Sequence, residues 1–148
     1  MKLIEPTTEF IKEVGFEMRE ADELEVRLSH DLDPLTAVIE SAKNSNICKV
    51  IEGDNGNPVG LTGVTNQSIW LLGTDELTAT KNHRKTLCID GIKWVQYCLD
   101  KTKKPIGNWV YHENKSSIKW LKYLGFTVET PRPYGLSRAL FCQFWRTN

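Results

Sequence analysis

The sequence predicts an α+β domain in which a mixed, twisted central sheet is flanked by helices. Segments with apolar residues at helical spacing alternate with short apolar runs typical of strands, and turn residues mark most of the boundaries. The length of 148 residues suits one domain with a substantial core. No apolar run is long enough to span a membrane. We therefore treat residues 1–148 as a single domain.

The net charge of zero conceals two oppositely charged halves. Residues 1–76 carry 15 Asp and Glu against 6 Lys and Arg, a net charge of −9. Residues 77–148 carry 4 Asp and Glu against 13 Lys and Arg, a net charge of +9. A basic half suits a phosphate-bearing ligand, and an acidic half suits an amine or a basic surface. The alternative is that the halves attract each other, or that copies of the chain stack head to tail.

The cysteines and histidines show none of the spacings that mark metal sites. The four cysteines lie far apart without a C-x-x-C pair, which predicts buried, reduced thiols. The three histidines have no further ligands at regular spacing, so no metal is predicted. The short basic run Lys101–Lys104 gives no specific signal for nucleic-acid binding.

The N-terminal part of the chain predicts one strand followed by helices. Residues 2–6 form a short strand, and residues 8–28 place apolar side chains at helical spacing. Gly15 is a point at which this long helix could divide in two. Asp33 followed by Pro34 begins the next helix, because Pro is favoured at the first helical position. That helix ends at residues 44–46.

A meander of three strands follows. Residues 47–51 and 58–64 are the first two strands, joined by a hairpin turn in which Asn-Gly readily adopts positive φ. Residues 68–72 are apolar on both faces, so they predict a central strand. Gly73 then either ends this strand or forms a bulge in it.

The remaining elements alternate between helices and strands. A polar loop over residues 74–81 leads to the longest helix, residues 82–101. The apolar stripe of this helix consists of Cys88, Ile92, Val95 and Leu99. Three strands are expected at residues 105–111, 126–129 and 140–146, and a loop is expected at residues 131–135.

The segment from Asn114 to Phe126 carries the strongest local signal. Asn114 is a natural N-cap, because its side-chain oxygen can accept a hydrogen bond from a free N–H of the first turn. Gly125 stands where a helix ends in the left-handed conformation. The helix between them has apolar residues on one face and lysines on the other. Its apolar residues are Ile118, Leu121 and Leu124.

This strand–Asn–helix–Gly-Phe unit resembles the C-terminal half of the GNAT acyltransferases, which transfer acetyl groups from acetyl-CoA to amines. Asn114, Ser117, Gly125 and Phe126 match the motif of that family. The predicted order of elements also matches over nearly the whole chain. The resemblance implies a GNAT-like acyl-CoA N-acyltransferase fold. One position departs from the pattern, because the Tyr that many members use as general acid corresponds to Leu121.

The resemblance also implies an acetyl-CoA site. In GNAT proteins the pantetheine arm pairs with the fourth strand where this strand splays from the fifth. The corresponding residues here are Leu71, Leu72 and Gly73. Asn114, which opens the helix of the motif, is counted with them as a cofactor-binding residue.

The phosphate-binding segment departs further from the family. GNAT proteins hold the pyrophosphate on a Gly-rich loop at the N-terminus of the next helix, whereas the corresponding residues 78–85 contain no glycine. Lys81, Arg84 and Lys85 are expected to hold the phosphates by charge pairing instead. The alternative is that they are ordinary solvated residues at the start of a helix.

Three carboxylates are candidate catalytic residues. Arg19, Asp22 and Glu25 share one face of a predicted helix. Early helices border the acceptor site in GNAT proteins, so Asp22 and Glu25 are candidates to hold an ammonium group or to act as base. Glu113, which follows the fifth strand, is the third candidate. The alternative is a solvated helix face with a local Arg19–Asp22 ion pair.

A closer resemblance rests on three segments, Met18–Glu25, Trp70–Leu77 and Asn108–Phe126. In this order and spacing they are similar to a family of small GNAT-like phage proteins, which includes the internal virion proteins, or internal core protein A, of podoviruses. This resemblance implies a bacteriophage protein in the virion or the host cytoplasm, with phage or host proteins as partners. Two functions therefore stay open: an acetyl-CoA-dependent N-acetyltransferase acting on an amine, or a catalytically inactive binding protein on the same fold.

Overall fold

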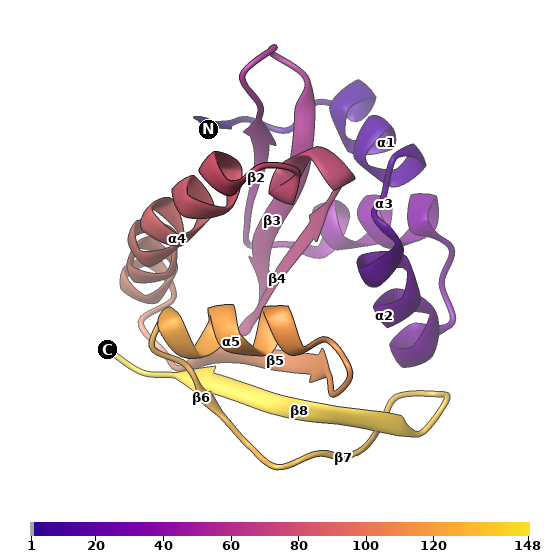
Figure 1. The fold of residues 1–148 in the computed structure, drawn as a ribbon, viewed down its shortest axis with the longest axis vertical. Coiled ribbons are helices and arrows are strands. Elements are labelled where there is room, and N and C mark those ends of the chain that lie inside the picture. The colour runs from indigo at the N-terminus through magenta and orange to yellow at the C-terminus, as the bar shows by residue number, and fades with distance from the viewer. Residues whose placement is uncertain (1) are drawn as a thin grey trace.

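The computed structural model describes residues 2–148. These residues form one eight-stranded sheet with five α-helices packed on its faces (Figure 1). The α+β class and the mixed sheet that the sequence predicts are confirmed. Within these residues no helix combines the length and the apolar composition needed to cross a membrane.

The sheet runs in the order β1-β2-β3-β4-β5-β8-β6, and β7 pairs with β8. Its first half is an antiparallel meander of β1 (Lys2–Ile4), β2 (Ile47–Glu52), β3 (Pro58–Thr65) and β4 (Ser68–Gly73). Its second half consists of β5 (Ile106–Tyr111), β6 (Thr127–Val128), β7 (Arg132–Tyr134) and β8 (Ala139–Arg146). β8 pairs antiparallel with the other three strands of that half, and the junction of β4 with β5 is parallel.

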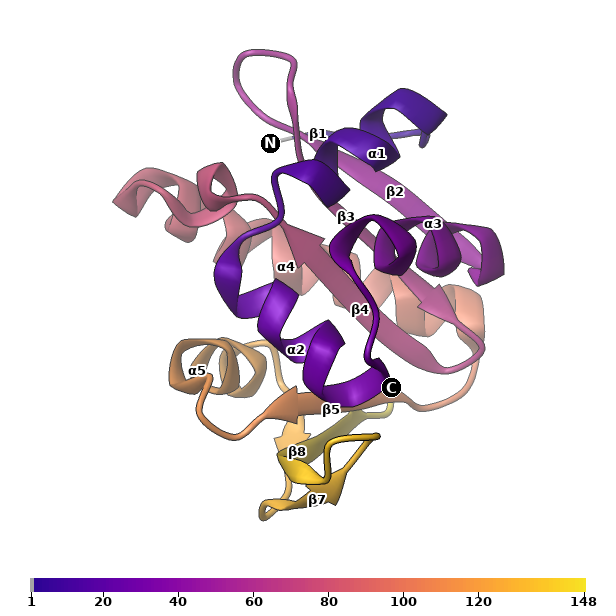
Figure 2. The same cartoon turned by 90° about the vertical axis from the view of Figure 1, so that its right-hand side faces the viewer.

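Helices cover both faces of the sheet (Figure 2). One face carries α1 (Thr8–Phe16), α2 (Glu20–His30) and α3 (Pro34–Asn44). The other face carries α4 (Lys81–Thr102) and α5 (Lys115–Tyr123), and a short 3₁₀ helix, η1 (Asp75–Thr78), precedes α4. The core is divided accordingly, since Leu61 and Leu72 pack with α1 and α3, whereas Val64 and Val110 pack with α4 and α5.

The long helix predicted over residues 8–28 divides after Phe16, and not at Gly15. Gly15 is buried inside α1, and a Cβ at this position would lie 2.8 Å from a methyl group of Val38 in α3. This glycine therefore allows α1 and α3 to pack closely. The break comes at Glu17 and Arg19, which leave the helical conformation.

The buried stripe of α4 also differs from the prediction. Val95 and Leu99 are buried as expected, but Ile92 is 44% exposed. Gly91 and Cys98 take buried positions instead. The reason is that α5 packs against the Gly91 side of α4, which turns the buried face away from Ile92.

The predicted loop at residues 131–135 is wrong, because Arg132–Tyr134 pair with β8 as β7. Pro133 is accommodated because an edge strand leaves some of its N–H positions unpaired. The turn that follows β7 is attached to α2, since the Leu136 N–H donates to the Ser29 carbonyl oxygen over 3.1 Å. This contact joins the second half of the sheet to the helical layer of the first half.

β4 and β5 diverge immediately after they meet. Ser68 pairs with Gly107, and the two strands form no further pair. The pairing of β4 with β3 continues without a bulge to Gly73, so Gly73 ends the strand. Near the narrow end, the Asn108 side chain donates to the Ile69 carbonyl oxygen over 2.9 Å. We call this gap the β4–β5 opening.

The helix motif of the sequence is confirmed. The Asn114 side chain caps α5 by accepting a hydrogen bond from the Ser117 N–H, and Gly125 has a φ of 90° after the helix. Leu121 and Leu124 are buried against α4 and the sheet.

We expect Gly107→Ala to lower the free energy of unfolding by about 1–3 kcal/mol. A Cβ at Gly107 would lie 2.1 Å from the Phe144 carbonyl oxygen, so the β5 or β8 backbone must move. Urea unfolding followed by circular dichroism measures the effect. Ser68→Ala, at the exposed partner of Gly107 in β4, is the control, and equal stability of the two variants would contradict the close approach.

Candidate active site

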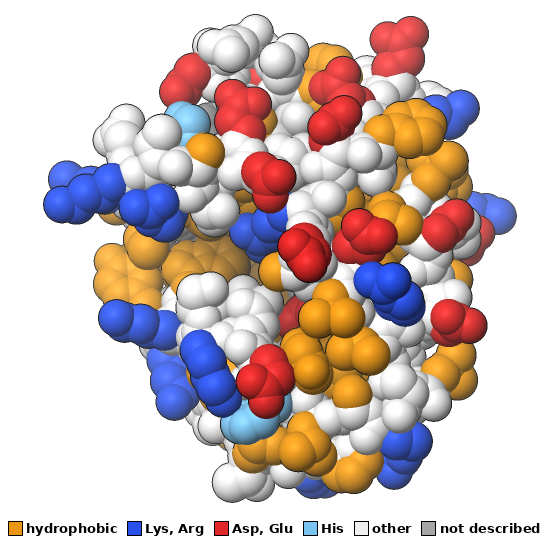
Figure 3. Space-filling view, turned by 45° about the vertical axis from the view of Figure 1, so that its right-hand side comes forward, with side chains coloured by type: hydrophobic (Ala, Val, Ile, Leu, Met, Phe, Trp, Pro, Cys, Tyr) orange, Lys and Arg blue, Asp and Glu red, His pale blue; other side chains and the backbone are white. Residues whose placement is uncertain are grey.

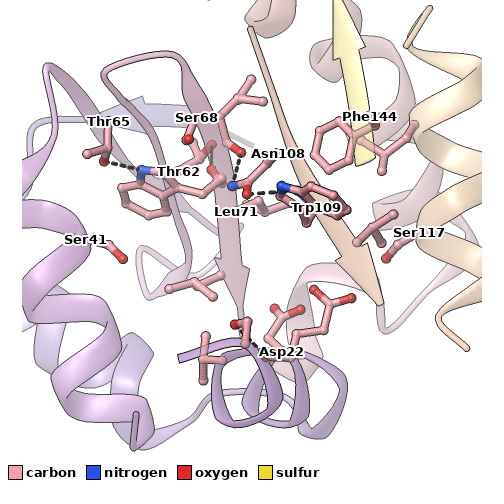
Figure 4. A pocket seen from close by; sticks show the side chains of 18 of the residues that line it. Asp22, Ser41, Thr62, Thr65, Ser68, Leu71, Asn108, Trp109, Ser117 and Phe144 are labelled. Carbon is pink, nitrogen blue, oxygen red and sulfur yellow. Dashed lines mark hydrogen bonds between the residues drawn. The ribbon is translucent and has the colours of Figure 1, made fainter. Parts of the chain in front are cut away.

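A cavity of about 500 Å³ lies at the β4–β5 opening. It is lined by α2 and α3 on one face of the sheet and by α4 and α5 on the other. Figure 4 shows side chains that meet there, among them Asp22 from α2, Leu71 from β4, Trp109 from β5 and Ser117 from α5. We call it the central cavity. It connects the two helical layers through the sheet.

Asp22 connects α2 to the end of β4. Its side chain accepts hydrogen bonds from the Gly73 N–H and from the Arg19 Nε, both over 2.7 Å. Burial raises the pKa of Asp22, and the Arg19 charge partly opposes this rise. The predicted Arg19–Asp22 ion pair therefore forms, but Asp22 is 4% exposed and does not lie on a solvated face.

Glu25 reaches from α2 to the end of β5. Its Oε1 accepts hydrogen bonds from the Tyr111 N–H over 3.0 Å and from the Asn114 side-chain amide over 3.2 Å. Burial raises the pKa of Glu25 to about 7, although these two hydrogen bonds lower it, and the Asp22 charge adds to the rise. The other carboxylate oxygen has no hydrogen bond to residues 2–148. Because Glu25 lines the central cavity, this oxygen is available to a ligand.

The end of β4 presents one open backbone amide. Thr74 directs its N–H to β3, whereas Gly73 directs its N–H away from β3 to Asp22. Successive residues of a strand alternate in direction, so Leu71 faces the β5 side and Leu72 faces β3. At Leu71, β5 has already diverged from β4. Of the three residues predicted here, Leu71 therefore presents an unpaired amide, while the amide of Gly73 is engaged by Asp22.

Lys81, Arg84 and Lys85 lie exposed on the first turns of α4. Thr80 caps the helix, and Arg84 also donates to the Thr78 carbonyl oxygen over 3.0 Å. The N-terminus of a helix favours anions, because its first N–H groups are unpaired and its dipole is positive there.

We call the exposed cations at the start of α4 the first basic rim. A second basic rim comes from the lysines of α5, which the sequence predicted only to point outward. Lys115, Lys119 and Lys122 are exposed along this helix. Figure 3 shows a hollow lined by hydrophobic side chains, with Lys and Arg side chains on two sides of it. The two basic rims favour an anionic ligand on the α4–α5 side of the central cavity.

The other predicted site residues lie apart from the central cavity or change its chemistry. Glu113 is exposed in the turn before α5 and does not line the cavity. Leu121, which the GNAT resemblance aligns with a general-acid Tyr, lines the cavity and is 8% exposed. Tyr123 is 57% exposed and points elsewhere. Thus α5 places no phenol hydroxyl in the cavity, and residues 2–148 contain no cluster of three or more potential metal ligands.

Trp120 is a cavity residue that sequence reasoning did not single out. Its indole Nε1 is the one buried side-chain nitrogen or oxygen without a hydrogen-bond partner in residues 2–148. A buried N–H without an acceptor costs free energy, so a ligand carbonyl group bonded to it would remove that cost. No sequence pattern distinguishes this Trp from an ordinary core residue.

The chain resembles known proteins in structure and not in sequence. No protein-family model matches it, and no curated protein matches its sequence. Among the solved structures that it resembles is ribosomal-protein-alanine N-acetyltransferase from Brucella melitensis, at 16% identity over 98% of each chain with a TM-score of 0.65. A variant of spermidine N-acetyltransferase SpeG from Vibrio cholerae matches at 13% identity over 98% of this chain and 93% of that chain, with a TM-score of 0.65.

A third similar structure contains a ligand. It is yncA, a proposed acetyltransferase from Salmonella typhimurium solved with acetyl-CoA, at 15% identity over 98% of this chain and 91% of that chain, with a TM-score of 0.62. These likenesses show that the chain has a GNAT-like fold. At such low identity they show the fold alone.

We expect Glu25→Gln to gain stability relative to the unmodified protein as the pH rises. Folding raises the pKa of Glu25 from 4.5 to about 7, so the folded state binds more protons in this window and loses stability as the pH rises through it. Between pH 4 and pH 8, the difference in unfolding free energy should move in favour of the variant by roughly 3 kcal/mol. Gln keeps an oxygen for Tyr111 and Asn114.

Chemical unfolding at a series of pH values measures this difference. Glu113→Gln is the matched control, because Glu113 is exposed. A Glu25→Gln difference that does not vary with pH would show that Glu25 keeps an ordinary pKa in the folded protein.

Proposed function

We propose that this chain is an acetyl-CoA-dependent N-acetyltransferase that acts on an amine. The observation that carries the proposal is Glu25, a partly buried carboxylate with a pKa of about 7 and one free oxygen at the β4–β5 opening. A group with a pKa near the working pH is well suited to general base catalysis. The spermidine and ribosomal-protein-alanine N-acetyltransferases that share the fold support the same class of reaction.

The α4–α5 side of the central cavity has groups that fit acetyl-CoA. The unpaired Trp120 Nε1 is available to a carbonyl group of a pantetheine arm. The exposed cations of α4 and α5 are available to its phosphates and replace the missing Gly-rich loop. The presence of acetyl-CoA in the yncA structure supports the same ligand here. When bound, acetyl-CoA would supply an acetyl group activated as a thioester.

Glu25 would take a proton from the acceptor amine. Tyr111 and Asn114 hold one of its oxygens, which leaves the other oxygen in a fixed position for an incoming ammonium group. An ammonium group that enters the cavity loses water, which lowers its pKa and favours transfer of the proton to Glu25.

Asp22 would have a positioning role. It is held by Gly73 and Arg19, and it fixes α2, and with it Glu25, against the end of β4. Because Asp22 engages the Gly73 amide, Leu71 provides the amide of β4 that is left to stabilise a developing oxyanion.

A second role follows from the resemblance to phage internal virion proteins. In this role the chain is a non-catalytic protein that binds phage or host proteins, in the virion or in the host cytoplasm. Three exposed large hydrophobic side chains favour it, namely Phe16, Tyr123 and Leu136. Leu121 and the glycine-free phosphate segment also suit a fold whose catalysis has been lost. Calorimetry that detects no binding of acetyl-CoA at millimolar concentration would favour this role and contradict the first.

We expect Glu25→Gln to lower kcat by about a hundredfold or more, because Gln cannot accept the proton of the amine. The Kd for acetyl-CoA should not change. In the unmodified protein, kcat/KM should rise with pH and level off above about pH 7, since the base acts in its ionised form. Steady-state kinetics across pH measure both effects.

Glu113→Gln removes a carboxylate outside the central cavity and is the control for this experiment. We expect it to keep kcat and the pH profile. A large loss of kcat in Glu113→Gln with none in Glu25→Gln would assign the base to Glu113 instead.

We expect the double variant Arg84→Glu plus Lys85→Glu to raise the Kd for acetyl-CoA about tenfold or more, because two phosphate partners become like charges. Lys103→Glu plus Lys104→Glu makes the same charge change at the exposed far end of α4 and is the control. Calorimetric titration measures both. Equal Kd values for the two variants would place the phosphates away from the start of α4.

A further inference from the structure

A row of aromatic side chains lines the α2–α3 side of the central cavity. It crosses four strands and consists of Trp70 in β4, Trp109 in β5, Phe141 in β8 and Tyr134 in β7. Trp70 packs in the core cluster of α1 and α3, which places it on that face of the sheet.

Strand alternation places the next two rings on the same face. Val110 belongs to the core of α4 and α5, so its neighbour Trp109 points to the opposite face. Cys142 belongs to that core as well, so Phe141 also points to the α2–α3 side. The four residues come from separate parts of the sequence and meet only in the folded sheet.

Three of the rings are held in place by contacts with one another, and Trp70 is held by the hydrogen bond that its Nε1 donates to the Thr65 hydroxyl over 3.2 Å. Trp109 and Tyr134 stack with centroids 4.4 Å apart and an interplanar angle of 13°, and Tyr134 lies 5.3 Å from the ring of Phe141. The turn after β7 is hydrogen-bonded to Ser29 of α2 through Leu136. A surface that is already ordered loses little entropy when it binds a ring.

Charged side chains are few on this side of the cavity, and the one nearest the aromatic row is Arg132, whose guanidinium carbon lies 5.2 Å from the centre of the Trp109 ring. Asp22 is paired with Arg19, and Glu25 is the partly buried carboxylate with an oxygen left free. Glu40 of α3 is exposed at the edge of the cavity. The interior therefore offers one partner for a cation, next to a wall that is mainly aromatic.

We propose that the acceptor is an arylalkylamine, a primary amine with one positive charge joined by a short alkyl chain to an aromatic ring. This inference rests on the proposed acetyltransferase function and adds the class of its acceptor. The ammonium group would bind Glu25, and the ring would lie against Trp109 and Tyr134. The amine nitrogen would form the amide bond as the carbon–sulfur bond of acetyl-CoA breaks, with one ammonium proton passing to Glu25 and a second to the CoA sulfur.

Two other classes of amine fit this side less well. A polyamine brings further ammonium groups past an aromatic wall, where the next carboxylate after Glu25 is the solvated Glu40 at the cavity edge, and burying an unpaired charge is costly. An amino acid brings a carboxylate close to Glu25, while the nearby Arg19 is already paired with Asp22.

Acetylation of four acceptors by the unmodified protein tests the class directly. Phenethylamine has the ring and one charge, phenylalanine adds a carboxylate, spermidine has more charges and no ring, and butylamine has neither ring nor extra charge. We expect kcat/KM for phenethylamine to exceed the other three values by about tenfold or more, which is the effect of one well-placed ring and one matched charge.

Variants of Trp109 test the position of the ring. We expect Trp109→Leu to raise KM for phenethylamine about fivefold, to raise KM for butylamine much less, and to be largely rescued by Trp109→Phe. Phenethylamine should also raise the melting temperature of the CoA-bound protein most for the unmodified protein, less for Trp109→Phe and least for Trp109→Leu. Tyr123→Leu removes an exposed ring outside the cavity and is the control.

The outcomes distinguish a wrong class of acceptor from a wrong reaction. Faster acetylation of spermidine, phenylalanine or butylamine than of phenethylamine would overturn the arylalkylamine class and leave the acetyltransferase function intact. Binding of acetyl-CoA without acetylation of phenethylamine would also overturn it. Absence of both acetyl-CoA binding and acetylation would overturn the proposed function, and this inference with it.

Discussion

The site depends on the point at which β4 and β5 stop pairing. The two strands share a single bridge and then diverge, so the backbone of Leu71 has no partner on β5 and a cavity connects the two helical layers. Other contacts must hold the sheet together across the gap. The Asn108 side chain bonds to Ile69 at the narrow end, and α2 spans the wide end through Asp22 and Glu25. The residues that stabilise the opening are thus the residues that line it.

Placing one buried and one partly buried carboxylate in this position is costly unless each is compensated, and the compensation differs between them. Asp22 is bonded to a backbone N–H and to the fixed charge of Arg19, which opposes its protonation. Glu25 is bonded to a backbone N–H and to the neutral amide of Asn114, with no cation bonded to it. Glu25 therefore has an oxygen free to exchange a proton with a ligand, while Asp22 is held on both sides and keeps α2 in place. The Asn114 that caps α5 also holds Glu25, so one residue serves both the motif and the site.

Local signals explain what could be predicted. The cap at Asn114, the turn at Gly125 and the pairing of Arg19 with Asp22 depend on residues within a few positions of one another, so they can be recognised in the sequence. The features that were missed depend on partners far along the chain. Gly15 is explained by the approach of α3, β7 forms because β8 offers it an edge, and the indole of Trp120 is unusual only because its surroundings leave it without an acceptor. The aromatic row was missed for the same reason, since it needs the register of four strands.

The fold relates the charge asymmetry of the sequence to the two sides of the central cavity. The acidic half supplies α1 to α3, and the basic half supplies α4 and α5, so the central cavity lies between them. If the two halves carried opposite charge mainly to attract each other, ion pairs should join them. Both Lys or Arg ion pairs formed in residues 2–148 lie within the acidic half, and the contact that crosses between the halves is a hydrogen bond of His83 with Asp54. The basic residues around the α4–α5 side therefore remain available to an external anion, and an amine would approach Glu25 from the opposite face of the sheet. The two ligands of an acetyl transfer would then meet at the β4–β5 opening, with the charge of each matched to the side from which it enters.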